Sequence, residues 1–245
     1  PCLLGKYLRN CIIVDECWEW LGEGGYAAKR TGGFGKIVAL YDRFFELRFK
    51  TFYNHIITIS TALKKRFKKQ ENVTVFYGGM ENEDLKNHTI EWARNKHQLP
   101  QDAFIIGMSN LTSSDHNDND IFFKAFEKLS REYNNLYLLA TGTDAQYIKK
   151  IKREYSFQDR IFFSGWIDFE SYSSYLCACN VFVMPYSNTA INVGRWPNKV
   201  GDYLCLERPV ITNPTGDIQV LFEKYKLGFM CEETAEGFYK IVKKI

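Results

Sequence analysis

Residues 160–223 read RIFFSGWIDFESYSSYLCACNVFVMPYSNTAINVGRWPNKVGDYLCLERPVITNPTGDIQVLFE, and this stretch decides the fold of the chain. It predicts strand, loop, helix, strand, long polar loop, helix, strand, Gly-containing turn and helix in that order. Such a succession builds half of a parallel sheet, and α/β proteins bind ligands at the carboxyl ends of such strands. The helix expected to open at Pro197 carries Lys199 and Asp202 in its first turns. A cation and a carboxylate there suit a phosphorylated, hydroxyl-rich molecule.

The same alternation extends on both sides of this stretch and predicts one complete domain. Six strands that alternate with helices indicate a Rossmann-like domain with a parallel sheet. Ahead of it, three further strands are expected, and Ser60 or Thr61 is expected to cap the short helix after the second of these. The strands of the complete domain are predicted at 103–109, 136–142, 160–165, 180–185, 208–212 and 227–231, and the three earlier ones at 11–15, 55–61 and 72–79.

A domain boundary is expected near residues 78–82. The Gly78-Gly79 pair offers freedom for a hinge, and after a polar helix at roughly 84–97 the alternation starts afresh beyond Pro100. We therefore predict an N-terminal domain over residues 1–80 and a C-terminal domain over residues 81–245. A parallel sheet of three strands would bury too little by itself. The first domain is accordingly interpreted as the second half of a Rossmann-like domain whose first half is absent from this sequence.

Composition excludes several classes of protein. The chain has 245 residues, of which 45% are hydrophobic and 25% charged, as in ordinary globular proteins. Its net charge of +3 is too small to argue for nucleic acid. No apolar run approaches the ~18 residues of a membrane-spanning helix, and the first residues lack a secretory signal. The seven cysteines include no CxxC pair, so we expect reduced thiols and a cytoplasmic location.

One segment leaves two interpretations open. Residues 34–53 read FGKIVALYDRFFELRFKTFY, in which aromatic residues alternate with Lys and Arg, and LKKRFKK follows at 63–69. The first interpretation is an amphipathic helix packed on a sheet with its charges in solvent. The second is a surface that meets anionic lipid headgroups. The second interpretation predicts peripheral contact with the inner face of a membrane.

The order of three blocks resembles the GT-B glycosyltransferases, in particular the large retaining family four. Residues 160–187 look like its Phe-x-Gly strand, polar helix and Pro-ended strand, and residues 197–222 like its next helix, strand and Gly turn. Residues 55–79 resemble its domain junction. The resemblance implies a nucleotide-sugar donor held by the C-terminal domain and a glycan or lipid-linked acceptor held mainly by the N-terminal one. It implies transfer with retention, without a protein nucleophile and with no cofactor besides the donor substrate.

The resemblance also assigns site residues. Asp202 falls where the family places the acid that binds the ribose hydroxyls, while position 194, where a first Glu is usual, is Gly. Pro197-Asn198-Lys199 is similar to a variant in which the Lys contacts the diphosphate. Gly107 and Gly142 are equally well interpreted as donor contacts or as glycines required by close packing. The remaining candidates are Asn188, Asn192, Arg195, Asn198, Thr215 and Gly216 on the donor side and Asp15, at a strand end, on the acceptor side.

The sequence departs from the family where two leaving-group cations are expected. Asn110 stands at the position of the usual Arg, and DHNDND at 115–120 offers no Lys. Positioned cations are worth several kcal/mol in such chemistry. Either Lys199, Arg195, a helix N-terminus or a metal replaces them, or the chain is a non-catalytic partner or sugar-nucleotide binder. The DHNDND stretch is interpreted as a solvated loop with Asp118 or Asp120 as helix cap, with a metal site as the alternative.

Overall fold

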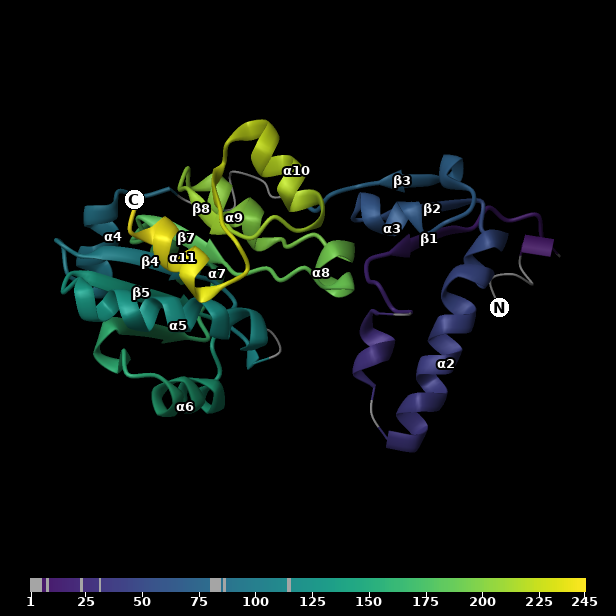
Figure 1. Ribbon diagram of the computed structural model, residues 1–245. Coiled ribbons are helices and arrows are strands. Elements are labelled where there is room, and N and C mark those ends of the chain that lie inside the picture. The colour runs from purple at the N-terminus through teal and green to yellow at the C-terminus, as the bar shows by residue number, and fades with distance from the viewer. Residues whose placement is uncertain are drawn as a thin grey trace. The chain divides into compact units, whose positions relative to one another are not determined.

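The computed structural model describes residues 6–7, 9–22, 24–30, 32–79, 85, 87–113 and 116–245 (Figure 1). They form two compact units. Unit 1 comprises Pro1–Gly78, Asn188–Pro197 and Thr215–Val220, and unit 2 comprises Gly79–Ser187, Asn198–Pro214 and Leu221–Ile245. Two segments that the sequence assigned to the C-terminal domain, 188–197 and 215–220, therefore belong to unit 1.

Unit 1 contains the three predicted strands in a parallel sheet of order β1-β2-β3. The register pairs His55 with Val14, and Ile56 with Val73. Leu63 is 1% exposed and packs with Ile56, Phe67 and Val73 in the core of this unit. The elements are β1 (Val14–Cys17), η1 (Tyr26–Lys29), α2 (Gly32–Arg48), η2 (Phe49–Phe52), β2 (His55–Thr58), α3 (Thr61–Lys65), η3 (Gln70–Asn72), β3 (Val73–Val75) and, from a later segment, α8 (Ala190–Gly194).

The cap predicted for α3 is confirmed at Ser60. Its hydroxyl oxygen accepts a hydrogen bond from the backbone N–H of Leu63 at 3.1 Å and donates to the carbonyl of Gly194 at 2.7 Å. The same side chain thus begins α3 and fixes the end of α8 to it.

Helix α2 turns its apolar side outward within unit 1. Phe34, Leu40 and Phe44 are 80%, 68% and 51% exposed, whereas Glu46 is only 6% exposed. Glu46 accepts two hydrogen bonds from the Arg66 guanidinium, at 2.6 and 2.8 Å, and one from the backbone N–H of Leu21 at 2.9 Å. The interpretation of α2 as an amphipathic helix with its charges in solvent is therefore wrong in one respect. The carboxylate of Glu46 is buried and holds the helix to the rest of unit 1.

Unit 2 contains the six predicted strands as one parallel sheet of order β6-β5-β4-β7-β8-β9. The chain runs outward from β4 to β6 and then returns to β7, which pairs with the other side of β4. The direction of strand order therefore switches between β4 and β7. The strands are β4 (Phe104–Met108), β5 (Leu136–Thr141), β6 (Ile161–Gly165), β7 (Val181–Met184), β8 (Val210–Thr212) and β9 (Gly228–Met230).

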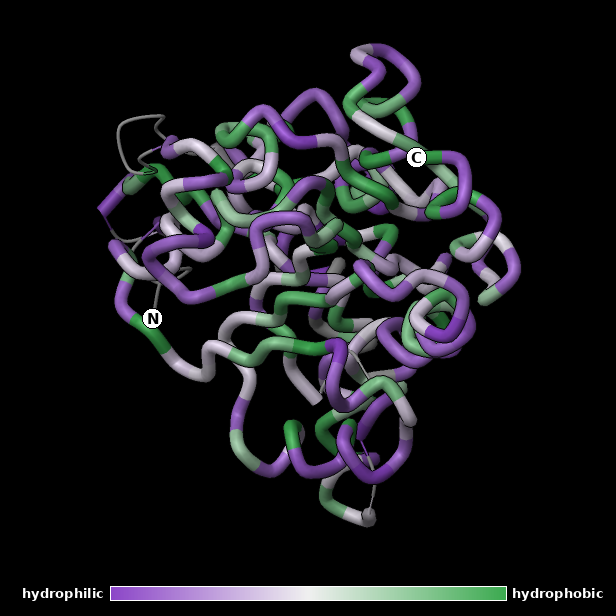
Figure 2. The backbone as a smooth tube through the Cα atoms, turned by 90° about the vertical axis from the view of Figure 1, so that its left-hand side faces the viewer, coloured by the Kyte–Doolittle hydropathy of each residue, from purple (hydrophilic) through white to green (hydrophobic). Residues whose placement is uncertain are grey.

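Helices cover both faces of this sheet. On one face α5 (His116–Glu132), α6 (Ala145–Glu154) and α11 (Ala235–Val242) enclose Phe122, Leu138 and Phe238, and Figure 1 shows α5 beside α11. Along the backbone, hydrophobic stretches are separated by hydrophilic ones (Figure 2). The other helical elements of unit 2 are α4 (Ile90–His97), η5 (Gln158–Arg160), α7 (Phe169–Cys177) and α9 (Lys199–Cys205), while α10 (Gly216–Tyr225) begins in unit 1 and ends in unit 2. Within the described ranges no helix is both long and apolar enough to cross a membrane.

Three local predictions were wrong or need correction. The helix expected at Pro197 begins at Lys199. In the part of 84–97 that is described, α4 begins at Ile90, and its cap is Thr89, whose hydroxyl accepts from the N–H of Trp92 at 3.2 Å. Asp118 and Asp120 do not cap α5, because this helix already begins at His116.

Gly107 lies inside β4 and not at its end. A Cβ atom added there would lie 2.6 Å from the ring of Phe182 and 2.7 Å from the sulfur of Cys179. Close packing therefore explains why this residue is a glycine, and a contact of its backbone with donor phosphates stays a prediction.

We expect Gly107→Ala to destabilise the protein by about 1–3 kcal/mol, because the added methyl overpacks the centre of the sheet. Urea unfolding monitored by circular dichroism measures the change. Gly33→Ala in α2 is the control, since a Cβ atom added at Gly33 would have no atom within 4 Å. Equal stability of Gly107→Ala and the unsubstituted protein would contradict this account.

Candidate functional site

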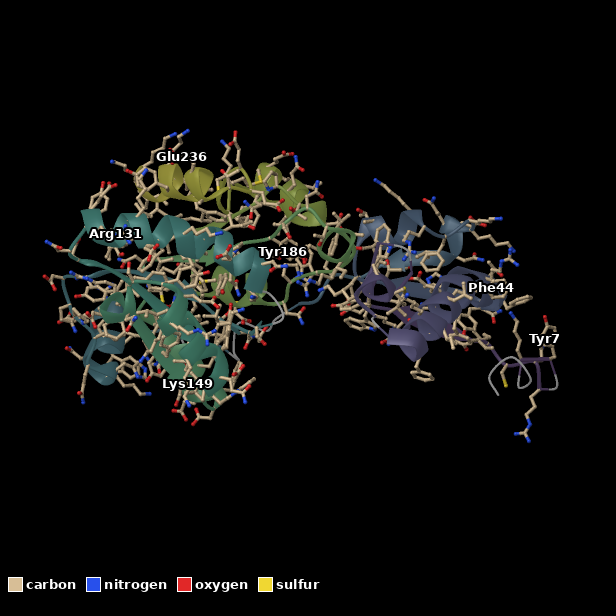
Figure 3. The ribbon with its side chains drawn as sticks, turned by 60° about the horizontal axis from the view of Figure 1, so that its bottom comes forward. Tyr7, Phe44, Arg131, Lys149, Tyr186 and Glu236 are labelled. Atoms are coloured by element: carbon tan, nitrogen blue, oxygen red, sulfur yellow. The ribbon has the colours of Figure 1, made fainter. Side chains whose placement is uncertain are left out.

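The strand order of unit 2 locates a candidate site at the carboxyl ends of β4 and β7. In open α/β sheets ligands bind where the strand order reverses, outside the carboxyl ends of the strands. The segments that leave these two ends begin with Ser109 and Pro185, and Tyr186 in the second of them is labelled in Figure 3.

A buried carboxylate stands beside this edge. Asp202 lies in the first turn of α9 and is 6% exposed. The hydroxyl of Tyr172, on α7, donates a hydrogen bond to its Oδ2 atom. Burial raises the pKa of Asp202 above its ordinary value, and the Tyr172 hydroxyl and the charge of Lys199 oppose that rise. The carboxylate is thus held by a tyrosine on one oxygen and lies near a cation.

The next residue fastens α9 to the end of β4. The hydroxyl of Tyr203 accepts a hydrogen bond from the backbone N–H of Ser109 at 2.9 Å and lies 2.8 Å from the Ser109 hydroxyl. Its ring stacks on Phe182 of β7 with the centroids 3.9 Å apart. Because Tyr203 is fully buried, this contact sets the position of Asp202 relative to the sheet.

A second network fixes the segments after β7 and β8. The Ser187 hydroxyl donates to Asp118 at 2.5 Å, and the N–H of Tyr186 donates to Oδ1 of Asn213 at 2.9 Å. The amide nitrogen of Asn213 donates to the carbonyl of Cys231 at 3.1 Å. These bonds join the carboxyl ends of three strands to the first turn of α5.

The same edge carries polar atoms without partners among the described residues. They are the hydroxyls of Thr141, Thr143 and Thr212 and the amide nitrogen of Asn119, all buried. Buried polar groups in proteins are nearly always hydrogen-bonded. This edge therefore has hydrogen-bonding capacity that a bound molecule can use.

Five of the predicted site residues lie in unit 2. Lys199 is the first residue of α9, and the exposed Asn198 precedes it without a side-chain capping bond. Gly142 follows β5 with a φ of +69°, and its N–H donates to the carbonyl of Gly165 at 3.0 Å. Lys199 and Asp202 are brought together, and Gly107 packs closely against Phe182.

The other donor-side candidates lie in unit 1. Arg195 donates to Oδ1 of Asn192 from Nε at 3.1 Å and from Nη2 at 2.7 Å. Gly216 has a φ of +55°, and a Cβ there would lie 3.0 Å from the carbonyl of Val193. Thr215 is 1% exposed and Asn188 is exposed. The structure thus gathers Arg195, Asn192 and Gly216 on the segments that complete unit 1.

Asp15 occupies the second position of β1 and not its end. Its carboxylate pairs with the Lys50 ammonium at 3.0 Å. A role on the acceptor side stays a prediction.

The alternative metal site at the DHNDND stretch stays a prediction. In the part of the chain that the structure describes, no group of three or more His, Cys, Asp or Glu side chains could hold a metal ion. In the DHNDND stretch, Asp118 accepts from Ser187, and Asp120 accepts from Tyr155 and pairs with Lys124 at 2.7 Å. Residue 115 lies outside the described residues.

Sequence reasoning missed Tyr172, Tyr203 and Ser109. Tyrosines in helices that pack on a sheet are usually core residues, and no spacing in the chain distinguishes these two. Only their three-dimensional contacts with Asp202 and the end of β4 identify them as parts of the site.

Comparison with known proteins gives a consistent result. The family described as "Glycosyl transferases group 1" matches residues 103–245. No curated protein matches the chain. The fold is similar to that of HepE from Anabaena, solved with UDP and glucose (TM-score 0.72, 14% identity, 99% of this chain and 64% of that one). It is also similar to sucrose-phosphate synthase from Thermosynechococcus elongatus (0.68, 17%, 99% and 61%) and to a glycosyltransferase from Rickettsia africae (0.63, 15%, 80% and 56%).

These likenesses confirm the GT-B fold expected from the sequence. The chain spans less than two thirds of the length of each of these three proteins.

We expect Tyr203→Phe to lower the free energy of unfolding by about 1–3 kcal/mol, because the buried N–H of Ser109 then has no acceptor. Urea unfolding measures the change. Tyr133→Phe on the surface is the control, since Tyr133 is 38% exposed. If both variants unfolded alike, the bond to Ser109 would not be what fixes the end of β4.

Proposed function

The chain belongs to the glycosyl transferases group 1 family, and on this premise we propose that it transfers a sugar from a nucleotide-sugar donor to a glycan or lipid-linked acceptor. The observation that carries the proposal is the buried carboxylate of Asp202 beside Lys199, at the edge where the strand order of unit 2 reverses. A carboxylate accepts hydrogen bonds from both hydroxyls of a ribose, and an ammonium group attracts a diphosphate.

In this proposal, unit 2 holds the nucleotide. The Oδ1 atom of Asp202 accepts hydrogen bonds from the ribose hydroxyls, while the Tyr172 hydroxyl holds the carboxylate in place through Oδ2. Lys199 at the start of α9 contacts the diphosphate, where the N–H groups of the helix start add favourable charge. Asn198, Gly142 and the unpartnered threonines 141, 143 and 212 offer further contacts with the donor.

We propose that transfer retains the anomeric configuration and that the donor sugar is a hexose. The protein then acts by positioning the reactants and by stabilising the diphosphate as it leaves, without forming a bond to the sugar. Asn110 stands where the family has a cationic Arg, so the charge of Lys199, with Arg195 as second candidate, carries the stabilisation. Asn188, Asn192, Thr215 and Gly216 are proposed contacts with sugar hydroxyls, and Asp15 a group on the acceptor side.

The proposed setting is polysaccharide biosynthesis in the cytoplasm, with peripheral contact at the inner face of the membrane. The support is the exposed apolar side of α2 in unit 1, the unit to which the resemblance assigns the acceptor. No cofactor besides the donor is proposed, and no nucleic acid.

Isothermal calorimetry with UDP, GDP and ADP tests the nucleotide site. We expect one of them to bind, and Asp202→Asn to weaken that binding about 10-fold or more, because a neutral amide accepts less strongly from the ribose hydroxyls. Lys199→Ala is expected to weaken the binding of the nucleoside diphosphate but not the binding of the nucleoside without phosphates. Asp159→Asn is the control, since this acid lies in η5, before the amino end of β6. Unchanged binding by Asp202→Asn would contradict the assignment.

The pH dependence of nucleotide binding tests the role of Tyr172. The Tyr172 hydroxyl favours the charged form of Asp202 and so lowers its pKa. We expect binding to weaken as the pH falls through the raised pKa of Asp202, because the protonated acid is a poorer acceptor. Tyr172→Phe removes the hydrogen bond that lowers the pKa of Asp202, so the loss of binding at acid pH should occur at higher pH in this variant. In Asp202→Asn this loss of binding at acid pH should be absent. An acid limb at the same pH in Tyr172→Phe would exclude this coupling.

Asn110 favours a second candidate function, a sugar-nucleotide-binding partner without catalysis. Donor hydrolysis and transfer assays on the full-length protein separate the two. Catalysis predicts turnover that falls at least 10-fold in Lys199→Ala. Tight nucleotide binding without turnover, and without any effect of Lys199→Ala, would contradict the catalytic function and favour the non-catalytic binding partner.

A further inference from the structure

Unit 1 contains a pocket of about 560 Å³ that the proposed sugar transfer does not use. Three cationic side chains, Arg48, Arg66 and Lys68, and three aromatic rings, Phe44, Phe52 and Phe67, line it. A pocket that combines cations with rings suits a ligand that is both anionic and apolar.

The pocket lies at the amino ends of the strands of unit 1. The end of α2 and the η2 turn lead into β2, and the residues after α3 lead into β3, so both linings precede a strand. Ligands of α/β sheets bind at the opposite, carboxyl ends. The pocket is therefore a separate feature from the edge at which substrates of such folds bind.

The three cations of the pocket differ in whether a carboxylate neutralises them. Arg66 is neutralised by Glu46 at 2.6 Å and lies over the ring of Trp20 at 4.1 Å. Arg48 and Lys68 are exposed, and no carboxylate of the described residues pairs with either; the Arg48 guanidinium lies 4.8 Å over the Phe44 ring. The pocket thus presents an excess of positive charge next to aromatic rings.

The apolar side of α2 continues from the pocket. Phe34, Ile37, Tyr41 and Phe44 are 80%, 67%, 59% and 51% exposed, and their spacing places them on one side of the helix. We call this side the α2 stripe. The described carboxylates of the helix are occupied, since Asp42 pairs with Arg30 at 3.0 Å and Glu46 with Arg66. Among the described side chains, the α2 stripe therefore has no free negative charge to repel an anionic surface.

We propose that the pocket binds the phosphate of an anionic phospholipid headgroup, with the α2 stripe entering the boundary between headgroups and acyl chains. Arg48 and Lys68 contact the phosphate, and Phe44, labelled in Figure 3, is the point where the stripe and the pocket meet. Basic residues attract anionic lipid, and apolar side chains of an interfacial helix add buried area. The inference rests on the proposed peripheral location but not on sugar transfer.

Co-sedimentation of the full chain with vesicles tests the proposal. We expect binding to phosphatidylglycerol–phosphatidylcholine vesicles and little binding to phosphatidylcholine alone. Arg48→Glu combined with Lys68→Glu should lower the partition coefficient about 10-fold or more. The matched control is Lys149→Glu combined with Lys152→Glu, which makes the same change of charge on exposed positions of α6. Equal losses in the two double variants would overturn the proposal, because general attraction would then explain binding.

Further experiments identify what occupies the pocket and the α2 stripe. Phe34→Ser with Ile37→Ser changes only exposed residues of α2, and we expect it to weaken vesicle binding while circular dichroism stays unchanged.

Calorimetry with inorganic phosphate tests whether the pocket binds a soluble ligand instead. Phosphate binding that Arg48→Glu abolishes, without any binding to vesicles, would overturn the lipid assignment. Analytical ultracentrifugation that showed a dimer broken by Phe34→Ser with Ile37→Ser would overturn it too, in favour of a second copy on the α2 stripe. Vesicle binding without transferase activity would support this proposal and contradict the catalytic one.

Discussion

The contact between β4 and β7 is the constraint on which the candidate site depends. Because Gly107 has no side chain, the ring of Phe182 lies against β4, and Tyr203 stacks on that ring. The stacked Tyr203 reaches Ser109 with its hydroxyl, and the adjacent Asp202 is thereby placed at the carboxyl end of β4. A packing condition in the middle of a sheet thus sets the position of a carboxylate at its edge.

The sheet of unit 2 could be predicted because its strands are short apolar runs, each followed by a polar turn. Strands such as Phe104–Met108 and Val181–Met184 are buried over most of their length, and burial is the property that a run of apolar residues indicates. Asp202 could be placed from its position after Pro197-Asn198-Lys199. Its partner Tyr172 could not, because 30 residues separate them and nothing in the chain records which hydroxyl meets which acid.

The division of the chain was harder to predict than its strands. A boundary near residue 80 treats sequence order as spatial order, but residues 188–197 and 215–220 belong to unit 1. Asp217 accepts from the backbone N–H of Thr61 at 2.7 Å and from its hydroxyl, and burial together with Asp217 raises the pKa of the nearby Tyr77 to about 12. Likewise the ion pair between Glu46 and Arg66 sets the orientation of α2, and hydrophobic periodicity does not predict such a pair.

The bonds from Ser60 to Gly194 and from Thr61 to Asp217 join residues that are 134 and 156 positions apart. During synthesis the ribosome releases residues 1–78 long before residues 188–197 and 215–220 exist. Unit 1 therefore has to wait for the chain that forms most of unit 2, although residues 1–78 are made earlier. Contacts between residues far apart in sequence also form slowly, because closing the loop between them costs conformational entropy. Unit 1 is thus completed late, and its exposed aromatic helix is the surface that needs protection from aggregation in the interval.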